Sequence, residues 1–98
     1  MLFSIIIPVF NRPGELAELL TSLTYQTFSQ FEVVVVEDGS MISSEKIIDR
    51  FKDLLSINYI QQENTGQGFA RNHGMAQARG EFFVVLDSDV IVPASYLE

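Results

Sequence analysis

The chain has 98 residues, of which 47% are hydrophobic and 19% charged, and its formal net charge is −7. This composition is typical of a globular domain and excludes a disordered chain. The six Lys and Arg residues are spread along the sequence, which argues against nucleic acid as a partner and against membrane binding through a basic patch. There is no cysteine, so disulfides and thiolate metal sites are excluded.

No apolar run approaches the roughly 20 residues that a membrane-spanning helix needs. The start, Met1 to Ser4, lacks the positive region of a secretory signal. We therefore expect a cytoplasmic protein, with peripheral association at the inner face of the membrane as the alternative. The end has no capping element, and Leu97-Glu98 matches a common scar between an insert and a purification tag. We expect residues 1–98 to form a single, truncated domain, with 97–98 as a candidate scar.

The first predicted element is a strand from Phe3 to Pro8, whose three consecutive isoleucines indicate burial on both faces. Pro8 lacks a backbone donor and is expected to end this strand. A helix should follow, opened by Asn11 or Pro13 and running to about Gln26. Its apolar stripe has helical spacing and consists of Leu16, Leu19, Leu20 and Leu23.

Four consecutive valines favour a second strand, from Phe31 or Glu32 to Val36. Ser43 or Ser44 is expected to cap a second helix, and residues 57–61 form a shorter third strand. A polar loop over residues 62–67 leads into a third helix, from about Gly68 to Ala78. Its small residues, Ala70, Gly74 and Ala78, would let its backbone approach a sheet closely.

Gly80 is expected to stop the third helix, and a fourth strand runs from Phe82 to Leu86. Strands that alternate with helices predict an α/β fold with a Rossmann-like parallel sheet, flanking helices and the strand order 3-2-1-4. The carboxyl ends of all strands would then lie at one edge. Such sheets bind ligands at that edge, where the strand order switches, here between the first and fourth strands.

Polar residues follow three of the four strands: Asn11 follows the first, Glu37-Asp38 the second, and Asp87-Ser88-Asp89 the fourth. Two carboxylates that share one site repel by about 4 kcal/mol at 4 Å near a protein surface. A hard divalent cation, Mg²⁺ or Mn²⁺, relieves this repulsion and is commonly shared with substrate phosphates. The alternative is a loop whose acidic side chains are solvated.

Other polar residues have two interpretations each. Asp38 is either a turn residue before Gly39 or a reader of a nucleobase N–H. The segment from Asn64 to Gly68 resembles a phosphate-cradling loop, but it follows the third strand, which excludes a dinucleotide-binding fold. Arg71 either pairs with a diphosphate or forms a surface ion pair. His73 is interpreted as a packed or capping residue and receives no role.

Six motifs, in the same order and spacing, carry a resemblance to family 2 glycosyltransferases over the whole chain. They are residues 4–11 (SIIIPVFN), 26–28 (QTF), 36–40 (VEDGS), 64–66 with 70–72 (NTG and ARN), 80–81 (GE) and 86–89 (LDSD). The resemblance implies the N-terminal, nucleotide-sugar-binding half of a GT-A fold. It also implies a nucleotide-diphosphate sugar as donor, a UDP-sugar being favoured, and a divalent metal, Mg²⁺ or Mn²⁺.

The resemblance also implies roles for single residues. Asp38 would read the base, Arg71 would lie near the diphosphate or the base, and Asp89 would bind the metal. Asp87 and Ser88 would lie at the ribose. The nucleoside pocket would be lined by Pro8, Val9, Phe10 and Asn11. Glu37 departs from the family, which usually has a second Asp there.

The implied enzyme transfers a sugar, with inversion, to a hydroxyl of an acceptor saccharide or lipid-linked glycan. Its catalytic base is expected beyond the end of this chain, so the fragment alone should bind the donor and metal without transferring sugar. Two alternatives stay open: a nucleotidyltransferase-like enzyme and a non-catalytic nucleotide-binding or assembly module. The flank where a missing half would pack is also expected to self-associate.

Overall fold

The computed structural model describes residues 2–28, 30–41, 43–64, 66–88, 93 and 96–97. Strands and helices alternate along the chain, as predicted. The elements are β1 (Phe3–Val9), α1 (Pro13–Thr24), β2 (Phe31–Asp38), α2 (Glu45–Phe51), β3 (Ile57–Gln62), α3 (Gln67–Gln77) and β4 (Phe82–Val85). No helix within the described ranges is long and apolar enough to cross a membrane.

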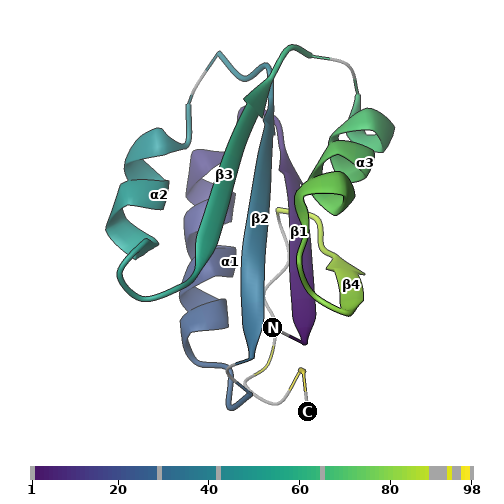
Figure 1. Ribbon diagram of the computed structural model, residues 1–98. Coiled ribbons are helices and arrows are strands. Elements are labelled where there is room, and N and C mark those ends of the chain that lie inside the picture. Colours follow the sequence, from purple (N-terminus) through teal and green to yellow (C-terminus); the bar gives the residue numbers. More distant parts are fainter. Residues whose placement is uncertain are drawn as a thin grey trace.

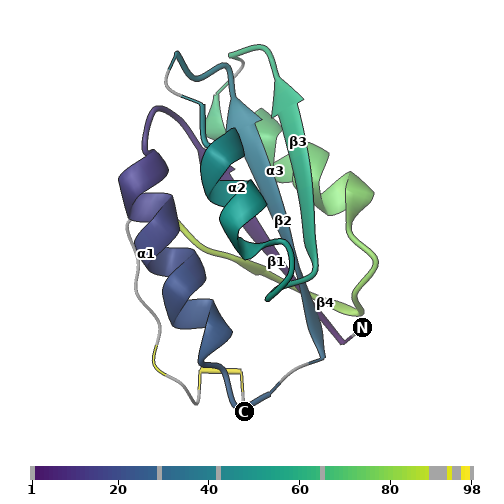
Figure 2. The ribbon, with the colours of Figure 1, turned by 90° about the vertical axis from the view of Figure 1, so that its left-hand side faces the viewer.

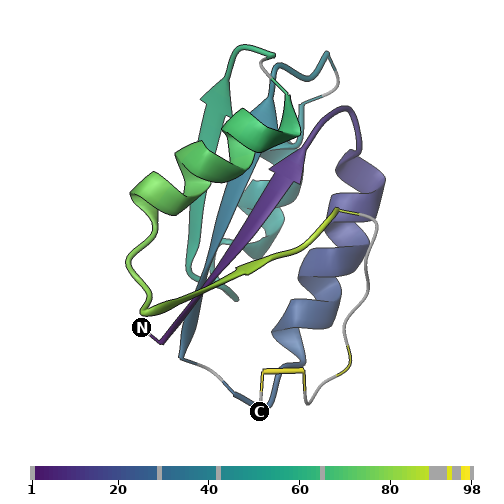
Figure 3. The same cartoon turned by 90° about the vertical axis from the view of Figure 1, so that its right-hand side faces the viewer.

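The four strands form one sheet in the order β3-β2-β1-β4, and every neighbouring pair is parallel, which confirms the predicted fold class and strand order. Strands β1, β2 and β3 point the same way, and the loops after β2 and β3 rise above their tips (Figure 3). The carboxyl ends of these strands therefore share one edge. Because β4 pairs with β1 on the side away from β2, the switch in strand order lies between β1 and β4.

Helices cover both faces of the sheet (Figure 1). Helices α1 and α2 lie on one face, where they are seen in front of the strands in Figure 2, and α3 lies on the other. Side chains of a strand alternate between the faces. Odd-numbered residues of β1 and β2 pack with the leucines of α1, whereas the even-numbered Ile6, Val34 and Val36 pack with Ala70 of α3. This alternation decides which polar side chains can meet.

Helix α3 lies close to the sheet, as its small residues predict. Ala70 is fully buried. A Cβ atom at Gly74 would lie 2.6 Å from Cγ2 of Ile6 and 3.1 Å from Cγ2 of Val36. Glycine at position 74 therefore allows this contact between helix and sheet.

Several predicted boundaries need correction: β3 ends at Gln62 rather than residue 61, and β4 ends at Val85 rather than Leu86. Three further corrections have structural causes. Pro8 does not end β1, which continues to Val9. The amide of Leu86 donates to the carbonyl of Ile6, so that the backbone groups of Ile6 and Pro8 face the side of β4. Because β4 ends at Val85, no hydrogen-bond donor is needed at Pro8.

The other two corrections concern the neighbouring elements. Strand β2 runs two residues beyond Val36, because its pairing with β3 continues to Asp38 and Gln62. Helix α1 ends at Thr24 rather than near Gln26. The side chain of Gln26 donates to the carbonyl of Pro93 at 2.6 Å and accepts from the amide of Leu97 at 3.2 Å.

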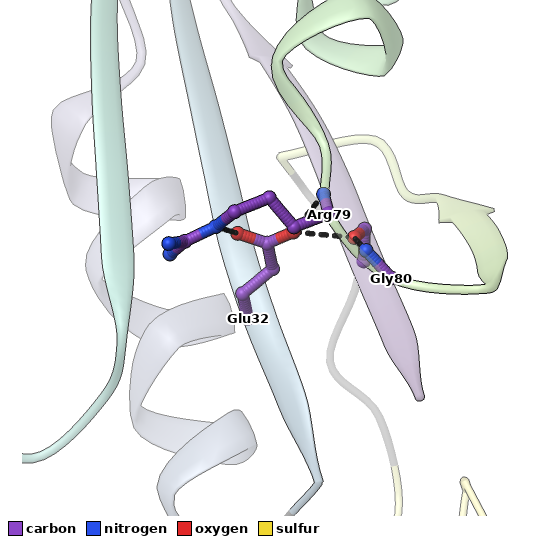
Figure 4. A network of polar contacts seen from close by, with 4 residues as sticks. Glu32, Arg79 and Gly80 are labelled. Atoms are coloured by element: carbon purple, nitrogen blue, oxygen red, sulfur yellow. Dashed lines mark hydrogen bonds and ion pairs between the residues drawn. The ribbon is translucent and has the colours of Figure 1, made fainter. Parts of the chain in front are cut away.

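A buried carboxylate joins the strands near their amino ends (Figure 4). Glu32 is 1% exposed, and its Oε2 accepts from the Ser4 hydroxyl at 2.6 Å and from the Arg79 amide at 2.5 Å. The Ser4 hydroxyl oxygen also accepts from the Gly80 amide at 2.7 Å. A Cβ atom at Gly80 would lie 2.6 Å from this oxygen. These contacts bind the segment between α3 and β4 to the sheet.

Candidate functional site

A cleft of about 400 Å³ opens at the carboxyl edge of the sheet, where the switch in strand order was predicted to place a site. Each wall comes from a loop or strand end at this edge: the end of β1 and the loop after it, the end of β2, the loop before α3, and the segment after β4. The lining residues are Pro8, Phe10, Arg12, Asp38, Asn64, Gly66, Asp87 and Ser88.

Asp38 reaches the cleft because even-numbered residues of β2 face α3. The residue is 5% exposed, and both of its carboxylate oxygens accept hydrogen bonds. Oδ1 accepts from Gln62 Nε2 at 2.9 Å, and Oδ2 accepts from the Gly66 amide at 3.0 Å. The carboxylate is therefore held in a fixed orientation between β2, β3 and the start of α3.

The turn interpretation of Asp38 applies to its neighbour, Gly39. Gly39 has φ +67°, in the left-handed region that favours glycine. A Cβ atom there would lie 2.5 Å from the backbone nitrogen of Asn64. Gly39 thus lets the loop after β2 lie directly against the loop before α3, and both loops border the cleft.

Glu37 points to the opposite face, toward α2. Its carboxylate accepts from the Ser44 amide at 2.7 Å, the Tyr59 hydroxyl at 2.8 Å and the Ser40 hydroxyl at 2.5 Å. Burial raises the pKa of Tyr59, and the neighbouring Glu37 adds to this shift, so that the phenol stays a donor. Glu37 therefore anchors the loop from β2 to α2. Ser43, rather than Ser44, accepts from the first helical amide, that of Glu45, at 3.1 Å.

Asn11 has φ 53° and connects two loops instead of lining the cleft. Its side-chain Oδ1 accepts from the Met41 amide at 2.6 Å, and its own amide donates to Ser40 Oγ at 2.8 Å. An Asn side chain tolerates the left-handed conformation that this position requires. Asn11 thus joins the loop after β1 to the loop after β2, and its contact with a nucleoside stays a prediction.

Arg12 lines the cleft, although it is not among the predicted site residues. It is the residue before α1, and its guanidinium forms an ion pair with Glu15 at 3.0 Å. The side chains are 55% and 42% exposed, so that the pair contributes little to stability. One feature of the sequence could have indicated Arg12: it is a cation in the loop that follows the first strand.

The loop before α3 was expected to present backbone N–H groups to a phosphate. Asn64 and Gly66 do line the cleft, and Gly66 precedes α3 with φ +99°. The amide of Gly66, however, donates to the carboxylate of Asp38. The prediction that this amide faces a phosphate is therefore wrong.

The acidic motif after β4 lies partly within the described residues. Asp87 is exposed, Ser88 is 6% exposed, and both line the cleft together with Asp38. Asp89, the predicted metal ligand, lies outside the described residues. Within the described ranges, no group of three or more His, Asp or Glu side chains could hold a metal ion. The carboxylates of Asp38 and Asp87 are nevertheless oxygen donors of the kind that a hard cation prefers.

The remaining predicted residues lie elsewhere. Val9 is 1% exposed and packs in the core beside α1. Arg71 is exposed on α3 and is not among the lining residues. Their contacts with a nucleotide stay predictions. His73, which received no role, lies on the same helix, with Nδ1 2.7 Å from Oε1 of Gln62.

Comparison with known proteins gives one consistent result. A family model described as glycosyl transferase family 2 matches residues 4–98. The poly(ribitol-phosphate) beta-N-acetylglucosaminyltransferase TarS of Staphylococcus aureus (strain Mu50) is 40% identical over 93 residues, and glycosyltransferase GlyA of Streptococcus pneumoniae serotype 4 is 38% identical over 96. The alignments cover 91% and 97% of this chain, but only 16% and 14% of the two relatives.

Solved structures agree with this result. A structure of S. aureus TarS in complex with UDP has a TM-score of 0.93 and 38% identity, over 99% of this chain and 30% of that one. A mannosyltransferase, PcManGT from Pyrobaculum calidifontis, in complex with GDP-Man and Mn²⁺, has a TM-score of 0.86 and 26% identity, over 94% and 28%. The four strands and their helices therefore match GT-A glycosyltransferases.

Proposed function

Because this chain belongs to glycosyl transferase family 2, we propose that it forms the nucleotide-sugar-binding part of an inverting glycosyltransferase. The observation that carries the proposal is the cleft at the carboxyl edge of the sheet, in which Asp38, Asp87 and Ser88 come together from separate strands. The complexes of TarS with UDP and of PcManGT with GDP-Man support a nucleotide-diphosphate sugar as the ligand class. A UDP-sugar is the favoured donor.

The cleft suits the base of a nucleoside at one end and its ribose at the other. Asp38 accepts an N–H from the base, since its carboxylate is fixed by donors on two sides. Phe10, 45% exposed, and Pro8 offer apolar surface to the nucleoside. Asp87 and Ser88 bind the ribose hydroxyls. Val9 and Asn11 complete this end of the site in our proposal, Asn11 through the loop contacts described above.

The diphosphate needs positive charge beside it, because it is an anion and the cleft carries two carboxylates, Asp38 and Asp87. Arg12 lies at the cleft and Arg71 on the helix beside it, so that either guanidinium can pair with phosphate oxygens. We assign Asp89 as the ligand of a divalent cation, Mg²⁺ or Mn²⁺. When bound, such a cation neutralises charge on the diphosphate leaving group. The Mn²⁺ in the PcManGT structure supports a metal of this class.

Transfer itself requires groups other than these. The acceptor in our proposal is a saccharide or lipid-linked glycan, whose hydroxyl a general base must activate. The chain spans 14–16% of the two curated relatives and 28–30% of the two solved chains. We place the base and the acceptor site in the part of the family's length that this chain does not span.

The cytoplasmic location of the protein also stays a prediction, which cell fractionation would check.

Calorimetric titration of the 98-residue chain tests the proposal. UDP, GDP and dTDP are titrated with Mn²⁺ present, first into the wild type and then into Asp38→Asn and Asp53→Asn. Asp53 is an exposed acid in the turn after α2 and serves as a control of equal charge change. We expect Asp38→Asn to weaken binding of the preferred nucleotide about tenfold or more, about 1.4 kcal/mol, because an amide cannot replace both acceptor oxygens. Equal affinities of the two variants would contradict the proposal.

The assembly-module alternative is tested with a different residue. Asp89→Asn should lower nucleotide affinity in the presence of Mn²⁺ and leave affinity in the presence of a chelator unchanged, because its carboxylate acts through the metal. An affinity in Mn²⁺ that equals that of the wild type would favour a module without a metal-bridged diphosphate.

A further inference from the structure

Behind Asp38, two more side chains continue its hydrogen bonds away from the cleft. Gln62, at the end of β3, donates from Nε2 to Oδ1 of Asp38 at 2.9 Å. Oε1 of the same amide lies 2.7 Å from Nδ1 of His73, on α3. Neither Gln62 nor His73 lines the cleft. A chain of three side chains thus runs from the cleft, across the end of β3, to a histidine that is not among the lining residues.

The chemistry of the three groups fixes the direction of this chain. An ionised carboxylate can only accept hydrogen bonds, so the atom of Gln62 that faces Asp38 must be the NH₂ group. The carbonyl oxygen of Gln62 then faces His73, and Nδ1 of His73 must carry the proton. Because Nδ1 keeps its proton in both the neutral and the charged imidazole, His73 donates in either state. Donation from His73 therefore prevents the Gln62 amide from turning its oxygen toward Asp38.

We propose that His73 is a positioning residue that acts through Gln62 to hold the Asp38 carboxylate as an acceptor for the N–H of a uracil-type base. The inference rests on the proposed function and adds to it a cause of base selectivity. Uracil presents an N–H at position 3, whereas cytosine presents a lone pair there, so a carboxylate held at this point favours UDP over CDP. Without the donor at His73, Gln62 would lose this anchor, so that Oδ1 would be positioned less firmly and the Gly66 amide would remain as an anchor of the carboxylate.

Two variants of His73 separate positioning from simple packing. His73→Ala removes the donor. His73→Asn keeps one, because Nδ2 of Asn occupies nearly the place of Nδ1 on the same carbon, and Asn and His have similar helix propensities. The UDP and CDP affinities of the 98-residue chain are measured by calorimetry for wild type and both variants. Thermal unfolding of each is recorded in parallel.

We expect His73→Ala to reduce the ratio of UDP to CDP affinity about fivefold, the equivalent of about 1 kcal/mol for one hydrogen bond. His73→Asn should restore the ratio. A wild-type ratio in His73→Ala would overturn the proposal. So would a reduced ratio in both variants, since the loss would then follow the imidazole ring and not the donor.

A measurement without nucleotide keeps this test separate from that of the proposed function. Long-range ¹⁵N–¹H spectra of the free protein report which imidazole nitrogen carries the proton. At a pH where His73 is neutral we expect the Nδ1–H form, and the Nε2–H form would overturn the proposal. Failure of the wild type to bind UDP, with the Nδ1–H form present, would contradict the proposed function and, with it, the assigned effect on base selectivity, but not the hydrogen-bonded chain.

Discussion

Glu37 and Asp38 are adjacent acids in one motif, yet they have different tasks because successive residues of a strand face opposite sides. Asp38 lies at the cleft beside α3, and Glu37 binds the loop that leads to α2. The departure from the family at position 37 therefore falls on the side chain that is turned away from the proposed ligand. Gly80 and Gln26 likewise belong to family motifs and act in the structure by packing and loop contacts.

The Ser4 hydroxyl should be among the more important polar groups for stability. It donates to buried Glu32 and accepts from the Gly80 amide, and its loss leaves both without this partner. We expect Ser4→Ala to lower the free energy of unfolding by about 1–3 kcal/mol. Urea denaturation measures this difference. Thr21→Ala, which removes an exposed hydroxyl bonded within α1, should stay within about 0.5 kcal/mol of the wild type; an equal loss in both would contradict the prediction.

Glu32 should also make stability depend on pH. Burial raises the pKa of Glu32, but the hydrogen bonds from Ser4 and Arg79 and the charge of Arg79 outweigh it and leave the pKa below 4.5. The folded state therefore binds the proton less readily than the unfolded state. This contribution is complete above about pH 4.5 and is lost as the pH falls through the folded pKa.

Thermal unfolding of the wild type and Glu32→Gln across this range checks the sign. The wild type should be the more stable protein near neutrality, and the gap should narrow as the pH falls below about 4.5. Glu63→Gln, at an exposed acid, should follow the wild-type curve. A gap that widens on acidification would mean that the pKa of Glu32 is raised in the folded protein.

At the scale of elements, α3 should be sensitive to the size of the residue that faces the sheet. Gly74→Ala places a methyl group 2.6 Å from Ile6 Cγ2, so that helix or sheet must shift, and we expect a loss of about 1–3 kcal/mol. Gly68 in the same helix has nothing within 4 Å of a Cβ atom. Gly68→Ala should therefore be neutral or stabilise by about 0.5–1 kcal/mol. Chemical denaturation measures both, and equal effects would refute the close contact.

The edge strand β4 should cause the self-association expected from the sequence. Phe83 and Val85 are 48% and 39% exposed and lie on the same face of the sheet as Ile6. Phe82 is 57% exposed. An exposed apolar edge favours contacts between chains. We expect sedimentation to detect dimers or larger species of the 98-residue chain, and Phe83→Lys to reduce them. Leu54→Lys, at an apolar residue 67% exposed in the turn after α2, is the control. Association that persists unchanged in Phe83→Lys would exclude this edge.

The elements themselves were predictable, because apolar periodicity determines them. Every strand and helix was predicted at the right place. Boundaries moved most clearly at Pro8, at Val36 and near Gln26, and by one residue at the ends of β3 and β4. The first two shifts depend on partners that are remote in sequence. Because β4 ends at Val85, no backbone donor is needed at Pro8, and β1 can continue to Val9. Pairing with β3 extends β2 to Asp38. Local propensity carries no information about such partners.

At the scale of the whole molecule, the sequence predicted the edge at which a cleft lies better than which side chains line it. Polar residues after parallel strands predicted the shared edge, and Pro8, Phe10, Asp38, Asp87 and Ser88 do line one cleft. Spacing could not reveal that the Asn11 side chain bonds a neighbouring loop, that Arg12 lines the cleft, or that the Gly66 amide is bonded to Asp38. These outcomes depend on side-chain direction and on contacts between loops.

The central claim is that the cleft at the carboxyl edge binds a nucleotide. Titration of the ¹⁵N-labelled 98-residue chain with UDP and Mg²⁺, followed by amide chemical shifts, tests it most directly. The largest changes should fall on residues that line the cleft: Phe10, Arg12, Asp38, Gly66, Asp87 and Ser88. The account would be contradicted if no shifts changed at millimolar UDP. It would also be contradicted if the changes centred on another hollow of the surface, which is lined by residues that include Leu54, Leu55 and Ser56.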